Sequence, residues 1–335
     1  MEILERVKAF ASLGKKIQSI PDTEVDEITA LARAENGWFT RNSIEKAFDG
    51  LTHMLREDHL KKWIENYHFK EDETKIIGIV MAGNIPAVGF HDLLATLISG
   101  HFAMIKLSSS DRVVITKIID WLVEIEPRFK KNIQIAEKLT GVDAVIATGS
   151  DNSARYFEHY FREIPHIIRK NRTSIAILTG DESNEELENL GEDIFSFFGL
   201  GCRNVSKIFT PKDYDTKSLF QAFERFGDVI HHHKYRNNYD YYKSIFLINQ
   251  QPHLDTGFLL VTSQKELTSP LSVLYHEQYH SLPELRQVLV PMKEKIQCIV
   301  SKEEIPFGQA QKPNVWDYAD DVDTLNFMQG LTESF

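Results

Sequence analysis

Between residues 76 and 160, short apolar runs alternate with stretches in which apolar residues recur at helical spacing. The runs within "KIIGIVMAGNIP", "HFAMIKLSSSD" and "VDAVIATGS" predict buried strands, the first over residues 76–81. Helical stretches follow each run, namely "HDLLATLISG", "RVVITKIIDWLVEI" and "DNSARYFEHYFREI". Because this alternation is typical of a parallel, doubly wound sheet, the sequence predicts an α/β fold.

Three loops follow the predicted strands, at residues 83–86, 106–110 and 148–150. In doubly wound sheets, ligands bind at the loops beyond the carboxyl ends of the strands. We therefore expect these three loops to form a binding site.

The second half of the chain predicts another α/β lobe. "SIAIL" and "NVSKIFTP" read as strands on either side of a helix. Ser183 and Glu186 have the spacing of a capping box, so this helix is expected to begin there and to continue to Phe198. "SIFLIN", "GFLLVTS", "LSVLYH" and "IQCIVS" are interpreted as further strands, whereas the first 70 residues predict helices with charged faces.

Composition excludes several classes of protein. The chain has 335 residues and a net charge of −11 without a basic stripe, which argues against a nucleic-acid partner. No apolar run approaches the roughly 20 residues needed to span a bilayer, and the N-terminus lacks the pattern of a secretory signal. The two cysteines, Cys202 and Cys298, fit a reducing cytoplasm.

The stretch "VLYHEQYHS" contains His276, Glu277 and His280 in the H-E-x-x-H spacing of zinc peptidases. That motif requires a helix, so that both histidines face one way. The preceding "LSVLY" reads as a strand, and Pro283 follows closely, so a metallopeptidase is the disfavoured alternative. We expect no metal site here, and none at the consecutive histidines 231–233, whose side chains diverge.

Cys202 is the first candidate for chemistry. The glycines beside it permit close approach of a substrate, and a reactive thiol needs such an accessible setting. Most cysteines, however, are buried small apolar residues, a description that suits Cys298. The immediate surroundings leave both interpretations of Cys202 open.

The wider stretch "FFGLGCRNVSKIF" resembles the nucleophile segment of the aldehyde dehydrogenase superfamily, in which a basic residue and a phenylalanine follow the cysteine. Lys207 and Phe209 are in those positions. "GNIP" resembles the family's Asn-x-Pro loop, which implies that Asn84 binds the substrate oxyanion. "AMIKLSSSD" resembles the Val-x-Lys-Pro-Ser strand, which implies that Lys106 contacts the cofactor ribose.

Three further segments resemble the family in the same order along the chain. "IATGS" is similar to the Phe-Thr-Gly-Ser turn, which implies that Gly149 and Ser150 lie beside the dinucleotide. "ELTSP" is similar to Glu-Ile-Phe-Gly-Pro, which makes Glu266 a ribose contact. "PFG" is similar to the late Pro-Phe-Gly-Gly and places residues of the substrate pocket at Pro306, Phe307 and Gly308.

The cofactor expected from the resemblance is NADPH, with NADH as the alternative. Many NAD-preferring relatives have a glutamate three residues after the ribose lysine, where this chain has Ser109. Ser108 and Ser109, with Arg112 further on, offer hydroxyls and a guanidinium that suit a 2′-phosphate. A helix N-cap is the structural explanation of the same serine run.

Departures from the family pattern narrow the set of reactions that we expect the chain to catalyse. Ala154 replaces the usual second glycine of the turn, and "HIIRKNRTSIAIL" has no carboxylate where hydrolytic members have their general-base glutamate. Without that base, water is poorly activated to cleave an acyl-enzyme. The pattern is similar to the LuxC-type acyl-CoA reductase branch, as is the tail "FGQAQKPNVWDYADDVDTLNFM".

The resemblance implies an aldehyde dehydrogenase-like fold of two Rossmann-like α/β lobes. We expect residues 1–178 to form the cofactor-binding domain and residues 179–300 the catalytic domain. Residues 301–335 are expected to return to the active site or to an oligomer interface. The implied reaction reduces an acyl-CoA or another acyl thioester to an aldehyde through Cys202. The resemblance also implies a homo-oligomer, and an acyl-protein synthetase as another source of the acyl group. Oxidation of an aldehyde to an acid or acyl-CoA is the alternative.

Overall fold

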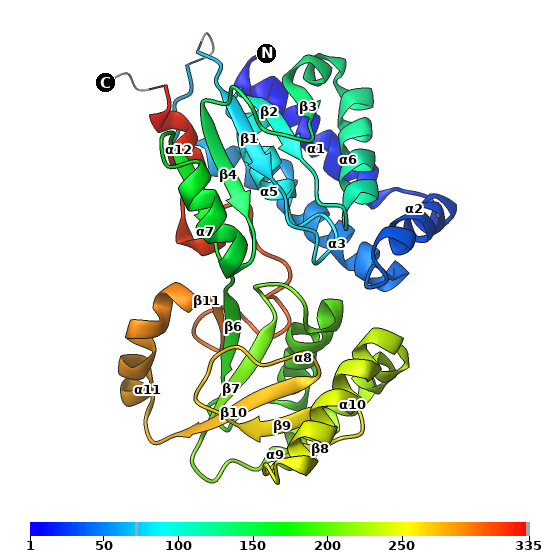
Figure 1. The fold of residues 1–335 in the computed structure, drawn as a ribbon, viewed down its shortest axis with the longest axis vertical. Helices are drawn as coiled ribbons and strands as arrows, with labels where there is room; N and C mark the ends of the chain where they lie inside the picture. Colours follow the sequence, from blue (N-terminus) through cyan, green and yellow to red (C-terminus); the bar gives the residue numbers. More distant parts are fainter. Residues whose placement is uncertain (71–72, 333–335) are drawn as a thin grey trace. The chain divides into compact units, whose positions relative to one another are not determined.

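The computed structural model describes residues 1–70 and 73–332. The chain divides into two compact units, the first made of residues 1–171 and 312–335 and the second of residues 172–311 (Figure 1). The sequence placed the boundaries elsewhere, at 178/179 and 300/301. The second unit therefore begins with the strand predicted from "SIAIL" and ends with the loop that contains "PFG".

The first unit has an all-parallel sheet with the strand order β3-β2-β1-β4-β5. Its strands are β1 (Ile76–Val80), β2 (Phe102–Lys106), β3 (Ile133–Ile135), β4 (Ala144–Thr148) and β5 (His166–Arg169). Its helices are α1 (Ile3–Gln18), α2 (Asp22–Glu35), α3 (Arg41–Met54), α4 (Glu57–Ile64), α5 (Phe90–Ile98), α6 (Arg112–Ile125), α7 (Asp151–Tyr160) and α12 (Thr324–Gly330). The doubly wound sheet and the N-terminal helices confirm the predicted α/β class.

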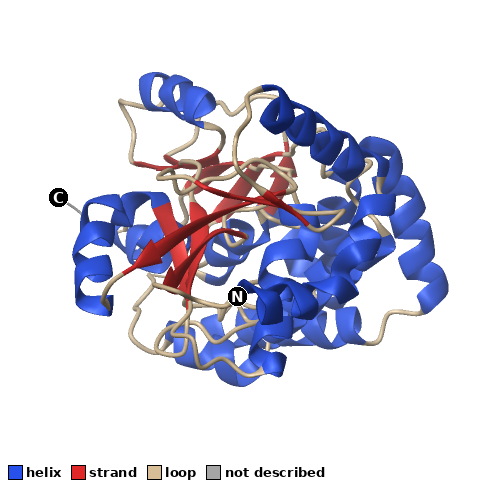
Figure 2. Ribbon diagram, turned by 90° about the horizontal axis from the view of Figure 1, so that it is seen from below, coloured by secondary structure: helices blue, strands red, loops and turns tan. Residues whose placement is uncertain are grey.

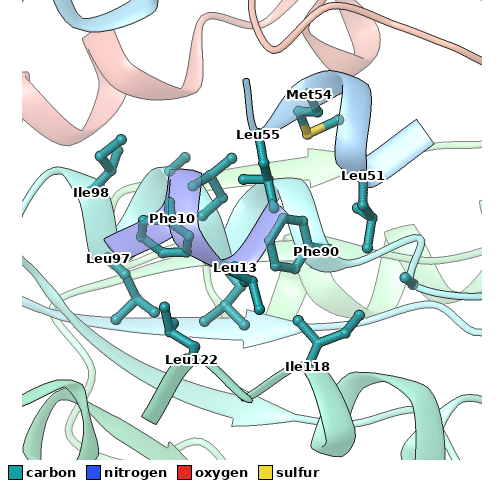
Figure 3. Packing of buried hydrophobic residues seen from close by; sticks show 14 of the residues in the cluster. Phe10, Leu13, Leu51, Met54, Leu55, Phe90, Leu97, Ile98, Ile118 and Leu122 are labelled. Atoms are coloured by element: carbon teal, nitrogen blue, oxygen red, sulfur yellow. The ribbon is translucent and has the colours of Figure 1, made fainter. Parts of the chain in front are cut away.

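The main core of the first unit forms between helices and one face of this sheet. Figure 3 shows Phe10 and Leu13 of α1 packed among Phe90 of α5 and Ile118 and Leu122 of α6, all of them buried. Burial of each such side chain contributes about 1.5–3 kcal/mol. The N-terminal helices therefore share one hydrophobic core with the sheet of the first unit.

The second unit has a six-stranded sheet with the order β11-β6-β7-β10-β9-β8 (Figure 1). Figure 2 shows the helices of both units in blue and the strands in red. Its strands are β6 (Thr173–Ile177), β7 (Val205–Pro211), β8 (Leu254–Asp255), β9 (Leu260–Ser263), β10 (Val273–Tyr279) and β11 (Ile296–Val300). Only β8 and β9 pair in antiparallel fashion among the described strands. Its α-helices are α8 (Asn184–Phe195), α9 (Thr216–Phe223), α10 (His233–Ile248) and α11 (Leu282–Leu289).

Short 3-10 helices complete both units. They are η1 (Pro127–Asn132), η2 (Ser196–Gly199), η3 (Glu224–His231), η4 (Val290–Lys295) and η5 (Ala319–Asp321). Within the described residues, no helix is long and apolar enough to cross a membrane.

Two predicted elements are wrong. "SIFLIN" is not a strand but lies in α10 and just beyond it, where Tyr235, Tyr239 and Phe246 form one buried helical stripe. A short apolar run cannot be distinguished from a helix segment by periodicity alone. The helix after the capping box ends at Phe195 rather than Phe198, because Phe197 and Phe198 have left-handed backbones with φ of 51° and 60°.

Candidate functional site

Cys202 is a half-buried cysteine in the turn that leads from η2 into β7. Gly199 and Gly201 on either side of Leu200 have φ of 84° and 97°, a region that favours glycine. The predicted break after α8 is therefore a tight left-handed turn. This turn places the cysteine just before the amino end of a central strand.

Ser174 of β6 anchors the turn that contains Cys202. Its Oγ donates a hydrogen bond to the Cys202 carbonyl at 2.9 Å, and its backbone N–H donates to the Asn204 carbonyl at 3.1 Å. The Ser174 side chain is fully buried, so these bonds form away from water. Ser174 therefore attaches the turn that contains Cys202 to β6.

Lys207 follows Cys202 in β7 and is 1% exposed. Its ammonium donates to the carbonyls of Gln264 at 2.8 Å and Lys265 at 3.1 Å, and it pairs with Glu277 at 2.5 Å. A buried cation is tolerated only when it is paired and hydrogen-bonded in this way. Lys207 therefore holds the loop in which Glu266 is exposed to solvent.

The H-E-x-x-H stretch extends along β10 and beyond its end, not along a helix. Nε2 of His276 lies 2.8 Å from Oγ1 of Thr210, and burial lowers the pKa of His276. In an extended chain, positions 276 and 280 are about 13 Å apart, too far to share one ion. Over residues 1–70 and 73–332 there is no group of three His, Cys, Asp or Glu side chains able to hold a metal.

In the first unit, the three predicted loops lie at one edge of the sheet. Strand β1 pairs with β2 on one side and with β4 on the other, and all three run parallel. The loops after these strands hold Asn84, Lys106 and the pair Gly149-Ser150. The chain winds outward from β1 to β3 and then returns to the other side of β1 at β4. The gap between β1 and β4 is therefore a topological switch point, where such sheets bind ligands.

Asn84 is exposed in the loop after β1, and Lys106 is exposed at the end of β2. Ser109 is also exposed, whereas Ser108 is half-buried. A Cβ at Gly83 would lie 2.5 Å from Oγ of Ser108, so only glycine allows the two loops to approach this closely. The Asn84 loop and the serine loop therefore pack directly against each other.

Asp111, which the sequence did not single out, connects the same two loops. Its Oδ2 accepts a 2.7 Å hydrogen bond from the backbone N–H of Ala87, a residue with a left-handed φ of 58°. Asp111 is 2% exposed, and burial raises its pKa to about 8, with the nearby Glu35 contributing in the same direction. Its Oδ1 has no hydrogen-bond partner among the described residues.

The serine run does not cap α6, which corrects the structural explanation considered above. Asp111 is at the N-cap position but makes no side-chain cap hydrogen bond. Instead, Glu35 of α2 accepts from the backbone N–H groups of Arg112 at 3.1 Å and Val113 at 3.2 Å. Oγ of Ser108 accepts a hydrogen bond from the N–H of Ser110 at 3.2 Å, and not from an N–H of the helix. The serine hydroxyls are therefore not used to begin this helix.

Gly149 and Ser150 begin α7. Oγ of Ser150 accepts from the Ser153 N–H at 3.3 Å as the N-cap. A Cβ at Gly149 would lie 2.8 Å from Cβ of Ser153 and 3.0 Å from the Phe157 ring, so the position requires glycine. The result is a helix N-terminus with a close backbone approach at the switch point, an arrangement that suits a phosphate group.

The residues of "PFG" have different surroundings from one another. Phe307 is buried in the core of the second unit, whereas Pro306 is exposed. Gly308, with a φ of 82°, donates its N–H to Oδ2 of Asp193 at 2.6 Å, and Ala310 donates to Oδ1 at 2.9 Å. Asp193 of α8 was not predicted as a functional residue, and it fixes this loop.

The stretch without a carboxylate extends from β5 to β6. Its Arg169 is buried and pairs with Asp92 at 2.7 Å, so it is a structural residue of the first unit. The carboxylates that follow β6 have partners of their own. Glu182 accepts from the Thr179 N–H at 2.6 Å, and Asp181 pairs with Lys302 at 3.0 Å.

A family model described as acyl-CoA reductase (LuxC) matches residues 7–219, a range that includes Cys202. No curated protein matches the sequence. Among solved structures, aldehyde dehydrogenase 21 from Physcomitrella patens is similar with a TM-score of 0.67 at 10% identity, covering 99% of this chain and 84% of that one.

Two bacterial structures agree with this result. An NAD-dependent aldehyde dehydrogenase from Sinorhizobium meliloti has a TM-score of 0.65 at 10% identity, covering 90% of this chain and 71% of that one. The NAD+ complex of an aldehyde dehydrogenase from Bacillus cereus has a TM-score of 0.62 at 12% identity, with coverages of 90% and 72%. These similarities establish an aldehyde dehydrogenase fold and confirm the predicted fold class.

Proposed function

Because the chain belongs to the acyl-CoA reductase (LuxC) family, we propose that it reduces an acyl thioester to an aldehyde through a covalent intermediate on Cys202. The observation that carries the proposal is the anchored left-handed turn, which places the Cys202 thiol just before a central strand within the matched range.

In the proposed reaction, the Cys202 thiolate attacks the carbonyl carbon of the acyl thioester. The tetrahedral oxyanion then collapses, the bond to the carrier sulfur breaks, and the departing thiolate takes up a proton. The acyl group is now a thioester on Sγ of Cys202. Hydride addition to its carbon gives a thiohemiacetal, which collapses to the aldehyde and restores the Cys202 thiolate.

The oxyanion of both steps is assigned to two N–H donors, the Asn84 side-chain amide and the Cys202 backbone N–H. Donors that are already in position stabilise charge as it develops in the transition state. The exposure of Asn84 and the anchoring of the 202–204 turn by Ser174 support this assignment.

The proposed cofactor is NADPH, which supplies the hydride when bound, with NADH as the alternative. The close backbone approach at Gly149 and the N-terminus of α7 suit its pyrophosphate. Lys106 would contact the ribose, while Ser108 and Ser109, which α6 does not use as a cap, would contact a 2′-phosphate. Glu266 would contact a ribose, from a loop that the contacts of Lys207 hold.

Oxidation of an aldehyde is the second candidate, since the neighbours in the structural comparison are aldehyde dehydrogenases. That reaction requires a base that activates water. The stretch from β5 to β6 offers no such base, because residues 166–178 include no Asp or Glu. Product analysis with an aldehyde, NADP+ and CoA separates the candidates: an acyl-CoA product supports the reductase, and a free acid the alternative.

The proposed partners are an acyl-CoA or another acyl thioester, an acyl-protein synthetase as a further acyl donor, and other copies of the chain. A substrate pocket near residues 306–308 is part of the same proposal. We also propose a cytoplasmic location, because neither Cys202 nor Cys298 forms a disulfide and a reducing compartment keeps cysteines in that state.

Replacement of the proposed nucleophile tests this function. Cys202→Ala should abolish both labelling by radioactive acyl-CoA and NADPH-dependent aldehyde formation, with the thermal unfolding midpoint unchanged within a few degrees. His280→Ala is the control, because His280 is exposed and belongs to the H-E-x-x-H stretch. It should leave both activities intact. Aldehyde formation by Cys202→Ala at the wild-type rate would overturn the proposal.

A further inference from the structure

Ser174 connects the two cysteines of the chain. Its Oγ lies 2.9 Å from the Cys202 carbonyl and 3.0 Å from Sγ of Cys298 in β11. Cys298 is 9% exposed, whereas Cys202 is half-buried. The three residues come from β6, β11 and the nucleophile turn, so their meeting depends on the assembled sheet.

The direction of the two hydrogen bonds follows from their atoms. A serine hydroxyl has one proton, and a backbone carbonyl can only accept. Ser174 must therefore donate its proton to the Cys202 carbonyl. The contact with Cys298 then requires that the Cys298 S–H donates to Oγ of Ser174. Cys298 is accordingly a protonated thiol with a defined donor role.

The strand pairings are irregular on both sides of Ser174. Against β7, Ser174 is opposite Val205 while Ile175 is opposite Lys207, so Ser206 is an additional residue. Against β11, the register shifts between Ile296 and Ile299, the interval that contains Cys298. Such bulges redirect side chains and are frequent beside active sites. Two register shifts at one position of β6 indicate that this meeting point is specifically built.

We propose that Ser174 and Cys298 are positioning residues for the nucleophile, acting as a chain of hydrogen bonds from the Cys298 thiol through Ser174 to the peptide carbonyl of Cys202. This inference rests on the proposed function, since it concerns the same thiol. Ser174 also binds Asn204 through its N–H, so one residue holds the turn on both sides of Arg203. The second cysteine thus contributes to the site without reacting in it.

Alkylation of Cys202 by iodoacetamide, followed by mass spectrometry of the native protein, measures its reactivity separately from catalysis. Ser174→Ala should lower the rate constants for both alkylation and acyl-CoA acylation by about tenfold, because a buried hydrogen bond to the turn is lost. The acyl-CoA KM should remain within about twofold of wild type, since Ser174 does not contact the substrate.

The Cys298 variants supply the matched pair, because they change the donor with little change of volume. Cys298→Ala should reduce both rate constants by about two- to fivefold, and Cys298→Ser, which retains an O–H donor, should restore them. This pair also tests the inference if Ser174→Ala does not fold. A merely structural role would lower the unfolding midpoint without changing the reactivity of the folded protein.

The two proposals fail in different ways. If Cys202→Ala remains active, the proposed function is wrong. If Cys202→Ala is inactive while Ser174→Ala and Cys298→Ala retain wild-type acylation and alkylation rates, only the positioning role is overturned. Equal loss of rate in Cys298→Ala and Cys298→Ser would also contradict the hydrogen-bond chain, because serine keeps the donor.

Discussion

Each unit contains a buried aspartate that accepts backbone hydrogen bonds, and the two sites differ in how completely the carboxyl group is satisfied. In the second unit, both oxygens of Asp193 accept from N–H groups of the loop 308–310. In the first unit, Asp111 accepts one bond from Ala87, and its other oxygen has no hydrogen-bond partner in the described part of the chain. Asp193 therefore fixes a loop firmly, whereas Asp111 holds its loop through a group that burial favours in the neutral form.

A third buried carboxyl group, that of Asp92, forms an ion pair with a buried arginine. Arg169 binds it at 2.7 Å and also donates to the Ala319 carbonyl at 2.7 Å and to Oγ1 of Thr324 at 3.0 Å. Ala319 and Thr324 belong to the segment that returns to the first unit after residue 311. The ion pair therefore fastens the tail of the chain to the sheet of the first unit.

The tail signature consequently has a structural explanation within the first unit. Tyr318 accepts from the Trp63 indole at 2.7 Å, and Tyr67 donates to Asp323 at 2.7 Å. Residues 317–324 thus contact α4, the segment after it and β5, rather than forming a charged surface loop.

The largest expected effect comes from breaking the fully paired site. Arg169→Met should lower the free energy of unfolding by about 3–5 kcal/mol, because Asp92 would remain buried without its partner. Lys170→Met is the matched control, since its ion pair with Glu158 is exposed and contributes about 0–1 kcal/mol. Urea unfolding measures both. Equal losses would show that the Arg169 pair is no more important than a surface pair.

The second effect concerns the doubly bonded aspartate. Asp193→Asn should cost about 1–3 kcal/mol, because its new NH2 group must face the N–H of either Gly308 or Ala310. Glu188→Gln on the same helix is the control, because its bond to Arg225 is exposed. Urea unfolding is again the measurement. A cost for Asp193→Asn no larger than that of the control would show that fixing the loop 308–310 does not depend on the carboxylate.

The sequence predicts most strands of both sheets, including the edge strand β11, but misses the short strands β3, β5 and β8. Buried parallel strands are apolar runs, so β1, β2, β4, β6 and β7 were identifiable. Strand β3 has only three residues, two of them exposed, and has no comparable pattern. The end of α10 was misread because its apolar cluster is short and the buried stripe to which Phe246 belongs begins at Tyr235.

The candidate site shows the same division between local and long-range information. Cys202, Asn84 and Gly149 could be proposed from the sequence because short motifs surround them. The contact of Asp111 with Ala87 and that of Cys298 with Ser174 could not be predicted, because the partners are 24 and 124 residues apart in the sequence. A buried polar side chain acquires its role only when the sheet brings such partners together, and no local pattern encodes this.

The smallest effect, and the sharpest contrast with Asp193, is expected for Asp111→Asn near pH 4. Burial raises the pKa of Asp111 to about 8, so the folded protein holds this group protonated there, and asparagine is a close neutral substitute. The unfolded chain releases the proton near pH 4. The contribution of the protonated Asp111 carboxyl to the free energy of unfolding is therefore complete below about pH 4, and it is lost as the pH rises through about 8. The free energy of unfolding of the wild type should accordingly fall relative to that of Asp111→Asn between pH 5 and 8, by at most about 1.4 kcal/mol per pH unit.

Urea unfolding of the wild type and of Asp111→Asn between pH 5 and 8 measures this difference. A wild-type advantage that grows with pH would show that Asp111 is instead a stabilised carboxylate, and the contrast with Asp193 would disappear.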